Sequence, residues 1–374
     1  MENISQVKHV ISEIDTKLVA KISVVVAALL FFGWTAFGFH KYFYIMNTSS
    51  SLLSGLFLAS IYLSFAIGLN LTYKLLGFAN FAHAEYFVVG AYVGVGWSYT
   101  FESQGLQGHD YVYVVLLAFL ASGIVAVIGD LLIFKPLRNR NATAETLMIT
   151  SIGWGILIRN IISIFFGGDS LYFRLPQQKG SMPTIWLGRR NGHGYLHYFT
   201  NIKYNYDKYV TFAIYTTIFF IGLLIIFMEY TKLGKALRAT SDNRDLAESS
   251  GINTELMILI TWFIGGGLAG VAGAIFVAKT PVIPYSGFLY LLPAFAVVVL
   301  GGIGSIRGSI VAALIIGFTE DLSKMYLSGQ EKINAAYFHF KLQRTGLFAY
   351  SIVFPFIILI LVIFLKPTGI YGEE

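Results

Sequence analysis

The sequence contains no cysteine, and only 12% of its 374 residues are charged. Without thiols the chain has no disulfide bond, no haem attached through thioethers and no thiolate metal site. Soluble domains carry about 25% charged residues. So low a charged fraction, with a mean hydropathy of +0.68, leaves too many apolar residues for one globular core. The composition therefore indicates a membrane protein.

Several catalytic motifs are also missing. The chain has no GxxxxGK[ST] phosphate loop, no HExxH and no GxSxG. It therefore does not hydrolyse ATP in the P-loop manner, and an intramembrane protease or lipase has no motif support. The histidines and carboxylates show no other metal-ligand spacing. We predict no catalytic residue, no metal site and no cofactor in this chain, and no nucleic-acid partner.

Uncharged apolar runs recur along the sequence, and a helix needs roughly 20 such residues to cross about 30 Å of hydrocarbon. The long runs are Ile22–Phe39, Ser51–Tyr73, Tyr111–Gly129, Val210–Met228, Leu256–Ala278, Thr280–Ile306 and Gly346–Leu365. Shorter or interrupted runs are Tyr86–Phe101, Thr146–Gly168 and Gly308–Thr319. Because they are continuous rather than alternating, we predict an all-α polytopic membrane protein with about ten transmembrane or partly spanning helices.

Two apolar regions, near residues 76–100 and 281–308, are predicted to be interrupted. The first has an Asn, a His and a Glu within six residues, and the second has three prolines followed by GGIGSIRG. Helix breaks at membrane depth are tolerated only in protein or beside a cavity, and in transporters they often mark the substrate path. The translocation-path candidates are Asn80, His83, Glu85, Gly90, Gly301, Gly302 and Gly304.

A purely structural interpretation competes with this one. On a helix, Asn80 and His83 would share one face while Glu85 points elsewhere. If a helix starts here instead, Asn80 would cap it, and Glu85 would lie near its positive end. The small-xxx-small pairs Gly90/Gly94, Gly266/Gly270 and Gly304/Gly308 favour close helix contact over ligand binding.

Three charged residues lie in or at the ends of apolar segments, and none is assigned to the translocation path. Arg159 lies inside one segment, so it needs a carboxylate or carbonyl partner or snorkels towards a membrane face. Glu320 and Asp321 end another segment and are expected to face water. The stretch Asp321–Thr345 is expected to be a loop.

Two polar stretches interrupt the apolar pattern. The longer one, near 169–208, is expected outside the membrane. The other, Tyr230–Glu255, is predicted to form one or two short helices outside the lipid, with a stop at Gly251. Loop Lys and Arg counts are nearly tied, so the positive-inside rule does not set the orientation. Residues 1–45 are expected to be an extension with an extra, uncleaved membrane helix at Ile22–Phe39.

Four blocks, in order, carry a family resemblance. Gly68–Gly94 includes NFAHAE followed by GAY, and Tyr230–Glu255 has an Arg-Ala start, an Asp-Asn pair and a Gly-Ile end. A glycine-rich block at Ala294–Glu320 and the tail LKPTGIYG complete the set. Together they resemble the permeases of branched-chain amino acid ABC importers. Ala84 stands where the family usually has glycine, and Arg307 stands where it often has a small residue or proline.

The resemblance implies a complex. Residues 46–374 would be the permease domain, multi-pass in the plasma or inner membrane, with loop 169–208 outside, loop 230–255 inside and both termini cytoplasmic. Its partners would be a second permease, identical or related, cytoplasmic ATPase subunits that use ATP and Mg, and an extracytoplasmic solute-binding protein that delivers a small molecule. In the coupling loop, charges would pair across the ATPase interface; its candidates are Arg238, Asp242, Asn243, Arg244 and Gly251.

The implied substrates are branched-chain or other hydrophobic amino acids. Two alternatives stay open. Related permeases carry urea or short amides. From another class, the chain could be a self-sufficient channel or an ion-coupled carrier, which would need charged residues inside the membrane.

Overall fold

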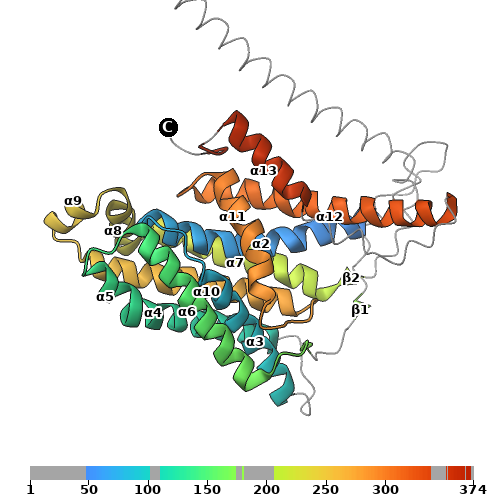
Figure 1. The fold of residues 1–374 in the computed structure, drawn as a ribbon, viewed down its shortest axis with the longest axis horizontal. Coiled ribbons are helices and arrows are strands. Elements are labelled where there is room, and N and C mark those ends of the chain that lie inside the picture. Colours follow the sequence, from blue (N-terminus) through green and yellow to red (C-terminus); the bar gives the residue numbers. More distant parts are fainter. Residues whose placement is uncertain are drawn as a thin grey trace, which may run out of the picture.

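A computed structural model describes residues 48–101, 110–173, 179–180, 206–337, 351, 353–366 and 368–371. The expected helix at Ile22–Phe39 and most of the 169–208 stretch lie outside these residues. Apart from the short antiparallel strands β1 (Lys179–Gly180) and β2 (Tyr206–Asp207), the described elements are helical, which confirms the predicted class (Figure 1).

The helices follow one another along the chain, with the longest connection between α6 and α7. In order they are α2 (Thr48–Leu76), α3 (His83–Phe101), α4 (Asp110–Gly129), α5 (Lys135–Arg138), α6 (Ala144–Phe166), α7 (Lys208–Tyr230), α8 (Lys232–Asp242), α9 (Arg244–Ser249), α10 (Thr254–Val277), α11 (Ser286–Gly301), α12 (Ile306–Tyr337) and α13 (Val353–Leu365). A π-helical turn, η2 (Asp130–Phe134), joins α4 to α5.

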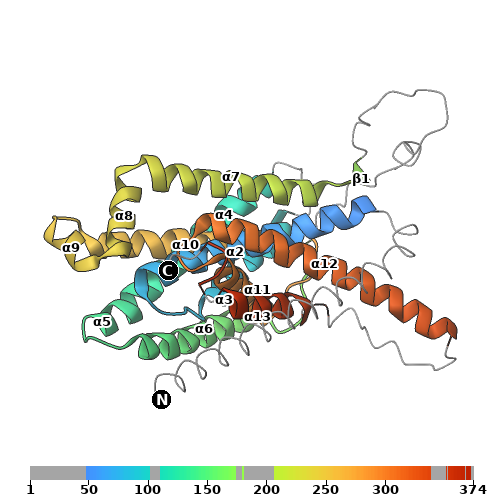
Figure 2. The ribbon, with the colours of Figure 1, turned by 90° about the horizontal axis from the view of Figure 1, so that it is seen from above.

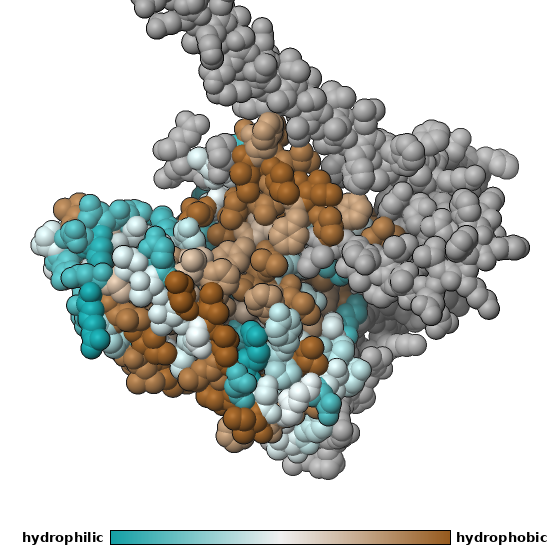
Figure 3. All heavy atoms as spheres, viewed as in Figure 1, coloured by the Kyte–Doolittle hydropathy of each residue, from teal (hydrophilic) through white to brown (hydrophobic). Residues whose placement is uncertain are grey.

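Five helical stretches of the described residues are long and apolar enough to cross a membrane: Leu53–Leu76, Tyr111–Arg138, Ala144–Phe166, Val210–Tyr230 and Thr254–Val277. Large exposed apolar side chains lie along α4, α6 and α7; Ile164 and Phe165 of α6, for example, are each 79% exposed, whereas the spans in α2 and α10 are largely buried in the bundle. Figure 3 shows apolar side chains over much of one face and polar ones gathered at the α8–α9 end. This distribution fits a bundle surrounded by lipid.

The centre of the bundle is made by α2 and α10, which lie in its middle in both views (Figures 1 and 2). Helix α10 packs against α2, α3 and α4, and α2 also packs against α7, α11 and α12. Glycines let these backbones approach closely. A Cβ added to Gly90 would overlap the backbone of Gly270, and one added to Gly273 would overlap the carbonyl oxygen of Phe87. The predicted close contact is confirmed at Gly90 and Gly270.

The predicted interruptions are also confirmed. The first break, residues 77–82, separates α2 from α3, and the second break, residues 302–305, separates α11 from α12. Two details of the prediction are wrong. Helix α3 begins at His83, so Asn80 lies in the turn before it rather than on a helix face with His83. Gly304 lies before α12 begins, and Gly308 instead packs against Gly301.

The expected end of the apolar segment at Glu320 is wrong as well. Helix α12 continues to Tyr337, because the sequence after Glu320 has no helix-breaking proline up to that point. Glu320 is only 5% exposed and does not face water. Its carboxylate accepts a hydrogen bond from the Tyr62 hydroxyl and pairs with Lys324 Nζ at 2.5 Å, one turn further along the helix.

The contact between α3 and α10 gives a testable prediction. We expect Gly90→Ala to lower the melting temperature of the purified protein, because overpacking a close contact costs about 1–3 kcal/mol. Gly153→Ala is the matched control, since a Cβ there meets no atom within 4 Å. Alanine is also the better helix former, by about 1 kcal/mol. Equal melting temperatures for the two variants would contradict this account of the α3–α10 contact.

Candidate functional site

The first break is held by polar side chains buried in the bundle. Asn80 Oδ1 accepts a hydrogen bond from the Ala82 backbone N–H at 3.1 Å, and Ser151 Oγ of α6 accepts one from the Phe81 N–H at 3.0 Å. The His83 ring stacks on Phe65 of α2 and places Nε2 3.1 Å from the Phe65 carbonyl oxygen. Asn80 and His83, both buried, thus satisfy or contact backbone groups in the interior of the bundle.

Glu85, in the first turn of α3, forms an ion pair inside the bundle. Arg159 of α6 donates from Nε to Glu85 Oε1 at 3.0 Å, and its Nη2 contacts the same oxygen. The guanidinium also lies 4.9 Å from the ring centroid of Tyr285. Arg159 therefore has a carboxylate partner, and the pair joins α3, α6 and the start of α11.

The second break is held by Asn70 of α2. Its Oδ1 accepts from the Gly304 N–H at 2.6 Å, and its Nδ2 donates to Ser309 Oγ at 2.9 Å. Gly302 and Gly304 both have positive φ, 96° and 83°, a conformation that favours glycine. One amide side chain thus bonds to both sides of the turn into α12.

The chain end after α13 caps α11. The Ile370 N–H donates to the Leu300 carbonyl oxygen at 2.8 Å, and the Tyr371 N–H donates to that of Gly301 at 3.2 Å. The last carbonyl groups of a helix have no partner within it. The tail supplies two of these partners and so fixes the α11 side of the second break.

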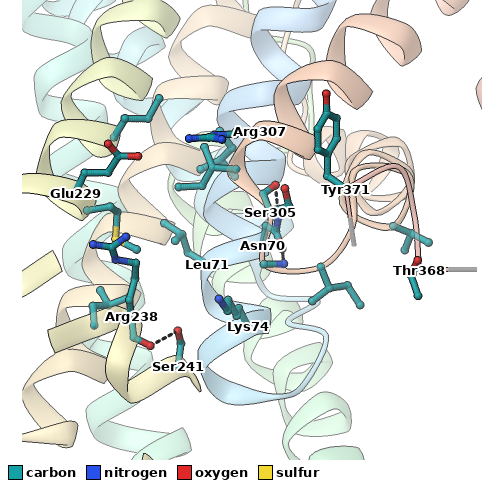
Figure 4. A pocket seen from close by; sticks show the side chains of 18 residues that line it. Asn70, Leu71, Lys74, Glu229, Arg238, Ser241, Ser305, Arg307, Thr368 and Tyr371 are labelled. Atoms are coloured by element: carbon teal, nitrogen blue, oxygen red, sulfur yellow. Dashed lines mark hydrogen bonds between the residues drawn. The ribbon is translucent and has the colours of Figure 1, made fainter. Parts of the chain in front are cut away.

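A cleft of about 660 Å³ opens beside the second break (Figure 4). Its walls come from α2, the end of α7, α8, the second break with the start of α12, and the tail. The residues that line it include Ile67, Asn70, Leu71, Lys74, Glu229, Leu237, Arg238, Gly304, Arg307 and Tyr371. The cleft therefore brings together Gly304 and Arg238, which the sequence analysis assigned to separate regions.

Helices α8 and α9 form a projecting arm, residues 232–249, at one end of the bundle (Figures 1 and 2). Asn243 ends α8 and caps α9, where its Oδ1 accepts from the Leu246 N–H at 2.9 Å. Gly251, at φ 82°, ends α9, and the Ile252 N–H donates back to the Ala247 carbonyl oxygen at 3.0 Å. The predicted pair of short helices and the stop at Gly251 are confirmed.

The charges of the arm pair within the chain. Asp242 lies 3.3 Å from Lys74 of α2, and Arg244 lies 2.8 Å from Glu255 of α10. Both pairs are partly exposed to solvent, and the expected pairing of these charges across an ATPase interface stays a prediction. Two large apolar residues of the arm are exposed, Leu246 at 64% and Leu233 at 44%. Leu246 is the more exposed of the two, so it is the first apolar contact that the arm offers to another protein.

The candidate residues thus fall into three places. Asn80, His83, Glu85 and Gly90 lie in the interior in or after the first break, and Gly301, Gly302 and Gly304 lie at the second break. The coupling-loop candidates lie in the arm or at its end. Sequence reasoning missed Asn70, Lys74 and Glu229 as cleft residues, and it noted Arg307 only as a departure from a family pattern. Asn70 carried one signal, an amide side chain within an otherwise apolar run.

The geometry defines a class first: a multi-pass membrane protein with interrupted helices, a polar cleft beside one interruption and a projecting helical arm, which is the architecture of a transport subunit. Residues 51–363 match the family described as "branched-chain amino acid transport system / permease component". The chain belongs to this family of ABC permease subunits, which are transport components and not enzymes.

Named relatives cover most of the chain. It is 29% identical over 332 residues to the high-affinity branched-chain amino acid transport system permease protein LivH of Escherichia coli, covering 86% of this chain and 94% of that protein. It is 30% identical over 312 residues to a probable LivH of Methanocaldococcus jannaschii, covering 83% and 88%. BraD of Pseudomonas aeruginosa is 28% identical over 329 residues, covering 86% and 95%. No solved structure matches the chain.

The buried ion pair gives a second prediction. We expect Arg159→Gln to destabilise the protein by about 3–5 kcal/mol, because it leaves the buried Glu85 carboxylate unpaired. The double variant Glu85→Gln with Arg159→Gln should recover much of that loss. Thermal unfolding of the four proteins of the cycle measures the coupling. Arg140→Gln, in an exposed turn, is the matched control; additive losses in the cycle would show that the pair does not stabilise the fold.

Proposed function

We propose that this permease imports branched-chain or other hydrophobic amino acids, delivered by an extracytoplasmic binding protein, in a complex driven by separate ATPase subunits that use ATP and Mg. The family match over residues 51–363 carries the proposal. The resemblance of the chain to LivH and BraD, whose names specify branched-chain amino acid transport, supports the substrate class. In this arrangement residues 1–45 are an extension and 46–374 the permease domain.

The α8–α9 arm is the part that we propose to dock on the ATPase. It is anchored at both ends, since α8 follows α7 directly and α9 leads into α10. Lys74 and Glu255 tie it to α2 and α10. A rigid arm of this kind moves the helices to which it is fixed, as domain closure requires. This end of the molecule is then cytoplasmic, and a second permease completes the translocation path.

Transport by the reconstituted complex tests the proposal. The chain is co-expressed with its ATPase, binding-protein and second-permease partners, and uptake of labelled leucine and labelled urea is measured in proteoliposomes. We expect leucine uptake that depends on ATP and on the binding protein. Urea uptake alone would reassign the substrate, and leucine uptake without ATP or partners would replace the importer with a self-sufficient carrier.

A substitution in the arm tests coupling separately. We expect Leu246→Asp to abolish most of the ATP-dependent uptake of leucine and to weaken ATPase association, because a charge replaces an apolar contact at the docking surface. Leu246→Met keeps the apolar contact and serves as the matched control. Both variants should show unchanged thermal stability, since Leu246 is largely exposed. Normal uptake and normal assembly of Leu246→Asp would rule out docking through α9.

A further inference from the structure

The cleft beside the second break has two chemically different parts. Its floor is apolar and buried, with Ile67 and Leu71 of α2 and Leu237 of α8 each at most 9% exposed. Its rim carries both signs of charge: Glu229 at the end of α7 faces Arg307 at the start of α12, and Arg238 of α8 lies beside Glu229 (Figure 4). An apolar floor beneath separated charges of opposite sign suits a small ligand that has an apolar group, a negative charge and a positive charge.

Three of the four charged side chains at the rim have no ion-pair partner among the described residues and can bind a ligand. Lys74 is occupied by Asp242. Among the described residues, no carboxylate forms an ion pair with Arg238 or Arg307, and no basic group forms one with Glu229. These three side chains, all exposed, leave one negative and two positive charges at the mouth of the cleft that form no ion pair with one another.

We propose that this cleft binds a zwitterionic amino acid with an apolar side chain. Arg307 and Arg238 take the α-carboxylate, Glu229 takes the α-ammonium group, and the aliphatic side chain lies on Ile67, Leu71 and Leu237. The proposal rests on the proposed function and adds to it a binding site within this single chain, on the side of the arm.

Glu229 separates this ligand from a simple anion. A lipid phosphate or an inorganic anion would gain from the two arginines but would be repelled by the carboxylate at the same rim, whereas a zwitterion uses both signs. A charge-assisted hydrogen bond contributes about 1.5–3 kcal/mol, so each partner matters to specificity. The exposed rim and the wide cleft favour weak binding, which suits a site from which a substrate must leave.

The position of the cleft links it to the arm. Arg238 and Leu237 belong to α8, whereas Arg307 belongs to α12 and is fixed by the second break. Movement of the arm therefore changes the separation between the two parts of the site. Docking on an ATPase would in this way alter the affinity of the cleft for its ligand, without any direct contact between ATPase and substrate.

The test is equilibrium binding to the full chain in phosphatidylcholine nanodiscs, without the binding protein. Three labelled probes are compared: leucine, leucinamide, which lacks the carboxylate, and the 2-oxo acid analogue of leucine, which lacks the ammonium group. We expect the unmodified chain to bind leucine most tightly. Glu229→Gln should weaken leucine and leucinamide binding about tenfold and strengthen binding of the 2-oxo acid, which the carboxylate repels. Arg307→Gln should weaken leucine and the 2-oxo acid but not leucinamide.

Glu145→Gln and Arg140→Gln make the same charge changes at exposed positions outside the cleft, and neither should alter binding. Equal weakening of all three probes, no effect of either cleft variant, or no detectable leucine binding would overturn the proposal. So would phosphatidylglycerol that co-purifies with the chain and is lost in Arg307→Gln. If leucine uptake by the whole complex persists in any of these cases, the proposed function stands and only the site fails.

Discussion

Two helix breaks inside the bundle depend on side chains that bond to backbone N–H groups where lipid supplies no partner. In hydrocarbon each unsatisfied group costs several kcal/mol, so a break persists only if the protein itself completes its hydrogen bonds. Asn80 and Ser151 do this at the first break, and Asn70 does it at the second. The tail at Ile370 adds a partner for a carbonyl group at the end of α11. The irregular backbone is therefore as strongly specified as the helices around it.

Helix α2 connects these features. Three residues in its C-terminal half make contacts in turn: Phe65 with His83 just after the first break, Asn70 with the second break, and Lys74 with the arm. These contacts are spaced along a single helix, so a displacement of the arm acts on the same rigid element that holds both breaks. The part of α2 that carries Asn70 and Lys74 also lines the cleft, where Leu71 forms part of the floor.

The sequence predicts what depends on neighbours along the chain. Apolar runs indicate the spanning helices, glycines and prolines indicate the breaks, and Asn243 with Gly251 marks the ends of α9. Contacts between distant residues leave no such pattern: Glu85 and Arg159 are 74 positions apart, and the cleft joins five separate parts of the chain. The continuation of α12 past Glu320 does not follow from the sequence, because charged residues there are typical of the end of a membrane segment; in the fold, Lys324 and Tyr62 satisfy that carboxylate within the helix bundle.

The ion pairs at the base of the arm limit how it can move. Glu255 is shared by Arg244 of the arm and by Lys135 and Arg138 of α5, and Arg138 also pairs with the buried Asp130. The π-helical turn that contains Asp130 joins α5 to α4. A force on the arm therefore reaches α4 through this group of charges and α2 through Lys74. Among the described residues, α12 and the tail share none of these ion pairs, so movement of the arm reaches the cleft wall that carries Arg307 through α2 and its bonds to the second break. The wall that carries Arg238, in contrast, is part of the arm itself.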